Sequence, residues 1–132
     1  MKGTPLRIID SHFHLCDYEG FDRIAIAAGH VNTEENLRES YKKFHYVYGI
    51  VMSNKTLEPS AHVYPDYLSY CIGLDSAYSN EHIEESLPLI EENLKRKQCC
   101  GIKLYPGYNH YYVSDSRYDP VYELARKYKK PV

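Results

Sequence analysis

Four short apolar runs alternate with amphipathic segments along the chain, and this alternation is the strongest constraint on what it can fold into. The run at residues 46–52 (YVYGIVM) is apolar at almost every position, which is typical of a strand buried on both faces beneath helices. Strands that alternate with helices form right-handed βαβ units, whose strands are parallel. The sequence therefore predicts an α/β fold with a parallel sheet. The four predicted strands span residues 6–9, 46–52, 68–74 and 99–105.

Helices are predicted between and after these strands, because apolar side chains recur at helical spacing there. The predicted helices span residues 33–44, 80–97 and 119–130, and a single helical turn is indicated at 21–28. Asn32, Asn80 and Asp119 are the predicted N-terminal caps, since their side-chain oxygens can accept hydrogen bonds from the first turn. Pro88 lies inside the second helix, where its missing N–H predicts a kink or a restart.

Two long connections follow the first and the fourth predicted strands, at residues 12–32 and 106–118. A connection of this length in a compact domain usually has a function. In parallel α/β folds, ligands bind beyond the C-terminal ends of the strands. We therefore expect the functional site at this end of the sheet.

A His-x-His pair stands at the end of the first strand. Side chains of a strand alternate between its two faces, so His12 and His14 project to the same side. Two imidazoles on one face can both reach a single divalent ion, and Asp10 can orient one of the rings from behind. The alternative is a pair of histidines in a polar loop. Their position after an apolar strand and an aspartate favours the metal site.

Lys103 interrupts the apolar run at residues 99–105, and a buried lysine is unfavourable unless it is paired. Alternation places Lys103 and Tyr105 on one face of this strand. Two interpretations stay open. Lys103 can bind an anionic substrate group or, once carbamylated, bridge two metal ions; it can also form a structural salt bridge. His110, in the second long connection, is a further candidate site residue.

The segment at residues 8–15 (IIDSHFHL) resembles the strand-one motif of the amidohydrolase superfamily. Residues 101–108 (GIKLYPGY) and 119–125 (DPVYELA) are similar to the strand-four region of its amidohydrolase-related branch, which includes metal-dependent hydrolases and some decarboxylases. The resemblance implies a (β/α)8 TIM barrel, which typically needs about 250 residues. Residues 1–132 would then form a single domain, the N-terminal half of the barrel with about its first four βα units.

The resemblance also implies a site and a reaction. His12 and His14 would be the first two ligands of one or two divalent metal ions, most readily zinc, and Lys103 matches the position that is carbamylated in binuclear members. Tyr105 and His110 would contact a small-molecule substrate, with Asp10 behind the ligands. Water activated by the metal would attack an amide, ester or lactone-type bond.

The resemblance places the catalytic base outside the sequence. In the family this base follows a later strand, so it is expected beyond Val132. Hydrolysis by metal-bound water requires such a base to accept the proton of the water. The 132-residue chain is therefore expected to be inactive by itself.

Other functions remain open on the same residues. The opening motif also resembles TatD-like deoxyribonucleases and other phosphoesterases, and a metal-dependent decarboxylase would use the same scaffold. A non-catalytic half-barrel module that self-associates is the alternative of another class, because a half-sheet leaves its edges uncovered. That alternative, like the hydrolase, allows a homo-oligomer.

Charge and cysteine usage narrow the partners and the location. The chain has 16 basic and 18 acidic residues and a net charge of −2, which does not favour a nucleic-acid or anionic membrane surface. No apolar run approaches the roughly 18 to 20 residues of a membrane helix. The N-terminus lacks the apolar core of a signal peptide, and the four cysteines include no Cys-x-x-Cys pair. A cytoplasmic location with reduced thiols is therefore expected, and Cys71 and Cys99, within apolar runs, are predicted to be buried.

Overall fold

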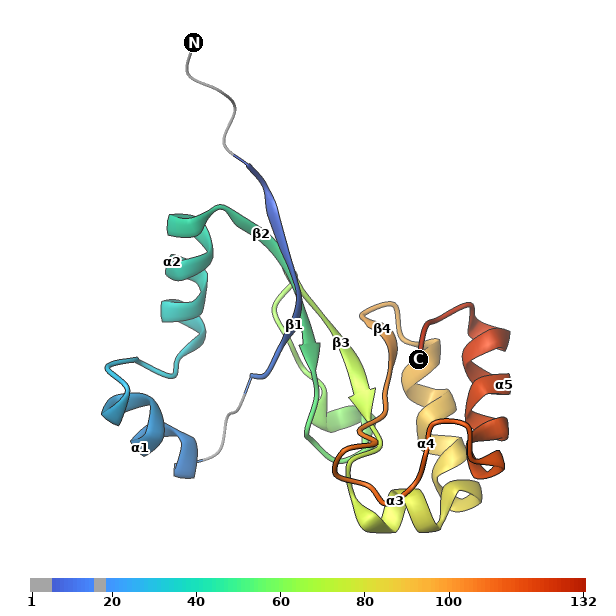
Figure 1. The fold of residues 1–132 in the computed structure, drawn as a ribbon. Helices are drawn as coiled ribbons and strands as arrows, with labels where there is room; N and C mark the ends of the chain where they lie inside the picture. The colour runs from blue at the N-terminus through green and yellow to red at the C-terminus, as the bar shows by residue number, and fades with distance from the viewer. Residues whose placement is uncertain (1–5, 16–18) are drawn as a thin grey trace.

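The computed structural model describes residues 6–15 and 19–132, and within them four strands form one parallel sheet. The strands follow the order β1-β2-β3-β4 (Figure 1). This order confirms the predicted α/β class and the parallel sheet, and it is compatible with part of a βα repeat. The complete (β/α)8 barrel stays a prediction. The strands are β1 (Ile8–Phe13), β2 (Tyr46–Met52), β3 (Leu68–Gly73) and β4 (Cys99–Lys103).

Helices flank the sheet at both ends of this strand order. Helix α2 packs on β2, whereas α4 and α5 lie side by side next to β4 (Figure 1). After α5 the chain returns to the sheet, since the Ile102 N–H of β4 donates to the Pro131 carbonyl at 3.0 Å. The helices are α1 (Glu19–Ala27), α2 (Glu34–Phe44), α3 (Ala77–Glu81), α4 (Ile83–Lys95) and α5 (Asp119–Tyr128), with 3-10 turns η1 (Pro59–Ala61) and η2 (Ser116–Tyr118).

Two predicted N-terminal caps are wrong. Thr33, and not Asn32, caps α2, because its Oγ1 accepts a hydrogen bond from the Asn36 N–H at 3.2 Å. Asn80 lies inside α3, a helix that begins after Ser76. The Asn80 side-chain amide instead donates to carbonyls at the end of β3 and the start of α3, at 2.6 and 2.8 Å. It ties the helix to the sheet rather than capping it.

The predicted cap at Asp119 is also wrong, and of the two outcomes predicted at Pro88, a kink or a restart, the restart does not occur. Helix α4 continues through Pro88, and the interruption lies earlier, at His82, between α3 and α4. Pro88 stands near the start of α4, so its missing N–H removes a single bond in an early turn. Asp119 is the first residue of α5, because η2 leads directly into the helix and Tyr118 is already in a helical conformation.

The hydrophobic core lies between the sheet and the helices α4 and α5. All six residues of β3 are buried, and the Tyr70 hydroxyl donates to Asn93 Oδ1 of α4 at 2.8 Å. Ile90 of α4 and Val121 of α5 are completely buried against this strand face. Helices long and apolar enough to span a bilayer do not occur in the described parts of the chain.

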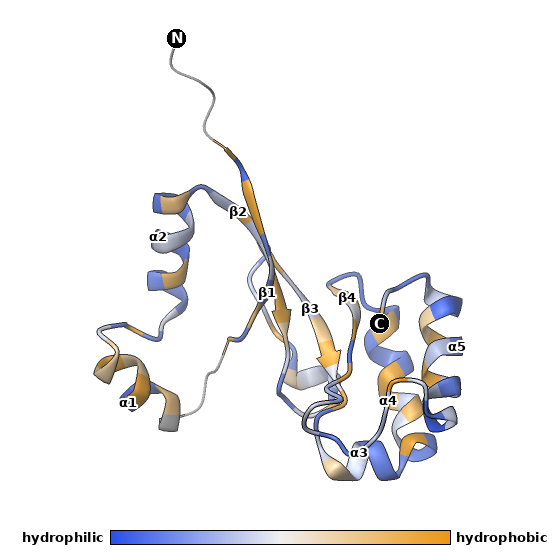
Figure 2. Cartoon of the chain, viewed as in Figure 1, coloured by the Kyte–Doolittle hydropathy of each residue, from blue (hydrophilic) through white to orange (hydrophobic). Residues whose placement is uncertain are grey.

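The N-terminal third is packed more loosely than this core. Helix α1 is largely hydrophobic (Figure 2), yet Ile24 is 59% exposed and Ile26 is 71% exposed. We therefore expect the amide hydrogens of α1 to exchange with solvent at least about a hundredfold faster than those of β3, because regions with few buried contacts open locally. Hydrogen–deuterium exchange followed by mass spectrometry measures this ratio. Equal protection of α1 and β3 would contradict it.

Candidate functional site

The two predicted metal ligands lie together at the C-terminal end of β1. His12 is the fifth residue of the strand, and His14 directly follows the last residue of the strand, Phe13. Their ring centroids are 5.5 Å apart, and the ring planes are nearly perpendicular, at 85°. Both side chains are exposed to solvent. The strand extends further than the predicted residues 6–9, and this extension places the His12 backbone within the sheet.

Backbone contacts hold both histidines. The His14 Nδ1–H donates to the Met52 carbonyl at the end of β2, at 2.8 Å. This bond fixes the tautomer, so that Nε2 of His14 carries the free lone pair. Asp10 accepts a hydrogen bond from the backbone N–H of His12 at 3.2 Å. Asp10 therefore positions His12 through the main chain rather than through the ring.

Lys103 is paired at the end of β4, as the structural interpretation of its sequence predicts. Its Nζ lies 2.8 Å from Asp75 Oδ2 and donates to Asn54 Oδ1 at 2.6 Å. The Lys103 side chain is only 9% exposed. Both Asp75 carboxylate oxygens are buried, and among the described residues they accept no hydrogen bond besides this ion pair. The lysine is thus the counter-charge of a carboxylate whose two oxygen atoms are covered, although the Asp75 side chain as a whole is 26% exposed.

Lys103 and the two histidines stand at the two outer strands of the sheet. Strands β2 and β3 lie between β1 and β4, and the Lys103 ammonium is engaged by Asp75 and Asn54 rather than by a residue of β1. Tyr105 and His110 lie beyond the end of β4, on its side of the sheet. The Tyr105 ring stacks on Tyr108 with centroids 4.5 Å apart, and the Lys103 ammonium lies 5.5 Å from the Tyr105 ring centroid.

The catalytic base implied by the resemblance is not assigned to any residue of this sequence. It is expected beyond Val132, so its identity and its position stay predictions.

His110 lines a shallow cavity of about 300 Å³ formed by the loop after β4. A larger cavity of about 500 Å³ opens beside Asn54 and Asp75. Sequence reasoning missed these two residues. Each lies two positions beyond the end of a strand. For Asp75 the sequence does contain a signal, because a buried lysine requires a nearby carboxylate. The larger cavity is lined by residues 54–58 of the loop after β2 and by Gly73, Asp75, Ser76, Tyr78, Ser79, Glu85, Ser86 and Leu89.

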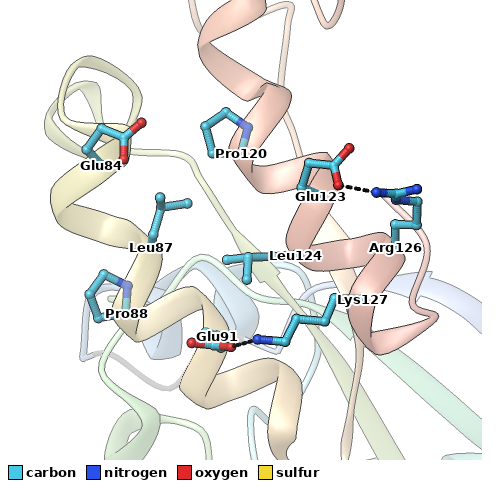
Figure 3. A pocket seen from close by; sticks show the side chains of 9 residues that line it. All are labelled: Glu84, Leu87, Pro88, Glu91, Pro120, Glu123, Leu124, Arg126 and Lys127. Carbon is cyan, nitrogen blue, oxygen red and sulfur yellow. Dashed lines mark hydrogen bonds and ion pairs between the residues drawn. The ribbon is translucent and has the colours of Figure 1, made fainter.

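A groove of about 880 Å³ lies between α4 and α5, away from the strand ends (Figure 3). Leu87 and Leu124 face each other across it. The charges on its rim are largely neutralised within the chain, as in the Glu91–Lys127 ion pair at 2.6 Å and the ion pair between Glu123 and Arg126. No histidine or cysteine lines this groove, and two of its glutamates are engaged in these ion pairs.

The histidine pair fits part of a metal centre. It supplies two neutral nitrogen ligands, whereas a catalytic zinc ion usually has three protein ligands. Within residues 6–15 and 19–132, no group of three or more His, Cys, Asp or Glu side chains is arranged to hold a metal ion. No protein-family model matches the sequence, and comparisons with curated proteins and with solved structures give no significant match.

Proposed function

We propose that this chain contributes the first two metal ligands of a metal-dependent hydrolase of the amidohydrolase superfamily. The observation that carries the proposal is the pairing of His12 and His14, with the Nδ1–H of His14 bound to a strand-end carbonyl. Metal-ligating histidines characteristically donate their second ring N–H to a carbonyl or carboxylate in this way. The resemblance of residues 8–15 to the strand-one motif supports the same assignment.

Each residue of the site then has a definite task. His12 and His14 would hold the cation through their ring nitrogens, Met52 keeps the His14 ring in place through its carbonyl, and Asp10 fixes the main chain at His12. When bound, a divalent ion such as zinc supplies Lewis-acid activation of water and of the substrate. The pairing of Lys103 with Asp75 favours a single ion, because the Lys103 ammonium is already bound by a carboxylate and its strand, β4, is at the opposite edge of the sheet from β1.

The proposed substrate is a small molecule with an amide, ester or lactone-type bond. Tyr105 follows the C-terminal end of β4 and is 44% exposed, so its ring can contact a polar substrate group, whereas the Lys103 ammonium is engaged by Asp75. His110 stands in the loop that follows and would line the same approach. A cytoplasmic location and self-association of the chain stay predictions.

Zinc binding by the 132-residue chain tests the proposal without requiring the base expected beyond Val132. We expect one zinc ion per chain, measured by competition with a chromophoric chelator. His12→Ala and His14→Ala should each weaken binding by at least about a hundredfold, the upper end of the loss seen when only a supporting contact is removed. His30→Ala, which removes an exposed histidine outside the pair, is the matched control and should bind zinc like the parent chain.

The proposal fails if both alanine variants retain the affinity of the parent chain. It also fails if His30→Ala weakens binding as much as they do, since the ion would then bind surface histidines at random. Cobalt(II), substituted for zinc, gives a second readout: its visible absorption should report nitrogen ligands in the parent chain and change in His14→Ala.

A further inference from the structure

We propose that Cys71 and Cys100 are a redox-active thiol pair that closes into a disulfide between β3 and β4. Their Sγ atoms are 3.7 Å apart, although the residues are 29 positions apart in the sequence. This inference does not rest on the proposed hydrolase function, because it concerns other residues and needs no metal ion.

The backbone allows this bond. Cys71 lies in β3 and Cys100 in the neighbouring strand β4, one position from the register partner of Cys71. Adjacent strands are about 4.8 Å apart, and a disulfide tolerates roughly 4.4–6.8 Å between its Cα atoms, so diagonal neighbours on two adjacent strands can be bridged. The pairing has an irregularity here, because Tyr70 pairs with Cys99 and Cys71 pairs with Gly101. Cys100 therefore has no partner of its own in the register, and its Sγ lies over β3, 3.4 Å from the Tyr70 carbonyl.

Gly101 leaves room for the two sulfur atoms. A Cβ at this position would lie 3.1 Å from Cys71 Sγ, so a larger residue would press against the thiol. To form the bond, the sulfur atoms must approach from 3.7 Å to about 2.05 Å. Cys71 is only 7% exposed and has little room to move. The movement therefore comes from rotation of the Cys100 side chain, which is partly exposed.

The two thiols differ in reactivity. The hydrogen bond from the Cys71 thiol stabilises the Cys100 thiolate, which lowers the pKa of Cys100 and raises the pKa of Cys71. The positive charge of Lys130 also lowers the pKa of Cys100. The thiolate is the nucleophilic form of cysteine. Cys100 is thus the attacking residue, and Cys71 is the residue that resolves the intermediate.

Cys99 does not compete for either role. It is 1% exposed and belongs to the hydrophobic core, and burial raises the pKa of its thiol. Its Sγ contacts the Gly101 carbonyl at 3.6 Å rather than another sulfur. The neighbouring positions 99 and 100 therefore have opposite properties, which makes Cys99 the natural control.

Hydrogen peroxide is the oxidant class that the pair would use, because it is small enough to reach a half-buried thiolate. The Cys100 thiolate attacks one peroxide oxygen, the O–O bond breaks, and the products are a sulfenic acid and hydroxide. The Cys71 thiol then attacks the Cys100 sulfur, the S–O bond breaks, and the sulfenic OH leaves as water with the Cys71 proton. The hydroxide from the first step takes up the proton that Cys100 released to solvent when it became a thiolate. In sum, two thiols and one peroxide give one disulfide and two water molecules.

Mapping of the disulfide tests the proposal on the full chain. Cys16 is replaced with serine so that three thiols remain, and the protein is treated with hydrogen peroxide at one equivalent. We expect the mass of the chain to fall by two hydrogen atoms, with no disulfide-linked dimer formed. A tryptic peptide that contains Cys71 should be linked to the peptide QCCGIK, residues 98–103. The oxidised chain should also melt at a higher temperature than the reduced chain, because the bond joins two core strands.

Single substitutions assign the two roles. Cys99→Ser should still form the linked peptides, whereas Cys71→Ser should accumulate a sulfenic acid at Cys100 that dimedone traps. Cys71→Ala serves the same purpose should the serine variant fail to fold. The proposal is overturned if the parent chain links Cys99 instead of Cys100, if peroxide gives only sulfinic acids, or if Cys71→Ala shows no dimedone adduct.

Discussion

Replacement of Lys103 with methionine is expected to lower the free energy of unfolding by about 3 kcal/mol, because removal of one partner leaves a buried charge without compensation. The Asp75 carboxylate oxygens are inaccessible to water, and the Lys103 ammonium at 2.8 Å is the cation that balances them. Methionine retains most of the aliphatic stem, so the loss reports the charge rather than a cavity. Urea denaturation, followed by circular dichroism, measures the difference.

An exposed ion pair of the same chain provides the matched control. Lys127 and Glu91 are joined at 2.6 Å across α4 and α5, but the Lys127 side chain is 61% exposed. Lys127→Met should therefore cost less than about 1 kcal/mol, as surface ion pairs do. A second substitution, Asp75→Asn, should recover part of the stability lost in Lys103→Met, because it removes the unbalanced charge. Equal losses in Lys103→Met and Lys127→Met would contradict the assignment.

The same experiment separates the two interpretations of Lys103. A lysine that bridges metal ions would stabilise the chain only while metal is bound, whereas an ion pair with Asp75 acts in the apo protein. We expect the loss in Lys103→Met to be unchanged in the presence of a chelator such as EDTA. A loss that disappears with the chelator would favour the metal-bridging role and, with it, a binuclear centre.

Strand bounds could be predicted where the sequence is continuously apolar. The bounds of β2 follow directly from its apolar run, but the prediction that both of its faces are buried is wrong, because only Gly49 and Val51 are buried and Val47 is 37% exposed. For β1 the prediction ended at Ile9, whereas the strand continues to Phe13. The missed residues include Ser11 and His12, which are polar because β1 lies at the edge of the sheet and exposes them. The pairing of Asp10 with Gly49 and of Phe13 with Val51 shows that the strand continues past Ile9, with an irregularity in the register at the two residues between them.

The contacts that define the site depend on proximity between distant residues, which a sequence pattern does not contain. The spacing of His12 and His14 is local, and their placement on one side of β1 follows from strand geometry. The partner of Lys103 is not local, because Asp75 lies beyond the end of another strand, and its identity depends on the register between β3 and β4. The thiol pair depends on an irregularity in the same register. Cys71 and Cys99 are buried as predicted.

Gly73→Ala is expected to destabilise the chain by about 3 kcal/mol, the upper end of the usual cost of overpacking a closely packed site. A Cβ at Gly73 would lie 2.4 Å from the Ser53 carbonyl oxygen and 2.7 Å from Asp75 Oδ2. The first contact is with backbone, which cannot rotate away. The Ser53 N–H also donates to the Cys71 carbonyl at 3.0 Å, so the end of β2 cannot withdraw from β3 without losing that bond.

Gly107→Ala is the control, because a Cβ there meets no atom within 4 Å. It should change the free energy of unfolding by less than about 1 kcal/mol, with stabilisation as the expected sign since alanine restricts the unfolded chain. A difference below about 0.5 kcal/mol between the two alanine variants in urea denaturation would show that the strand ends are not closely packed. Gly73→Ala should also displace Asp75 from Lys103. The double variant Gly73→Ala/Lys103→Met should therefore lose less free energy of unfolding than the sum of the losses in the two single variants, because both changes break the same ion pair.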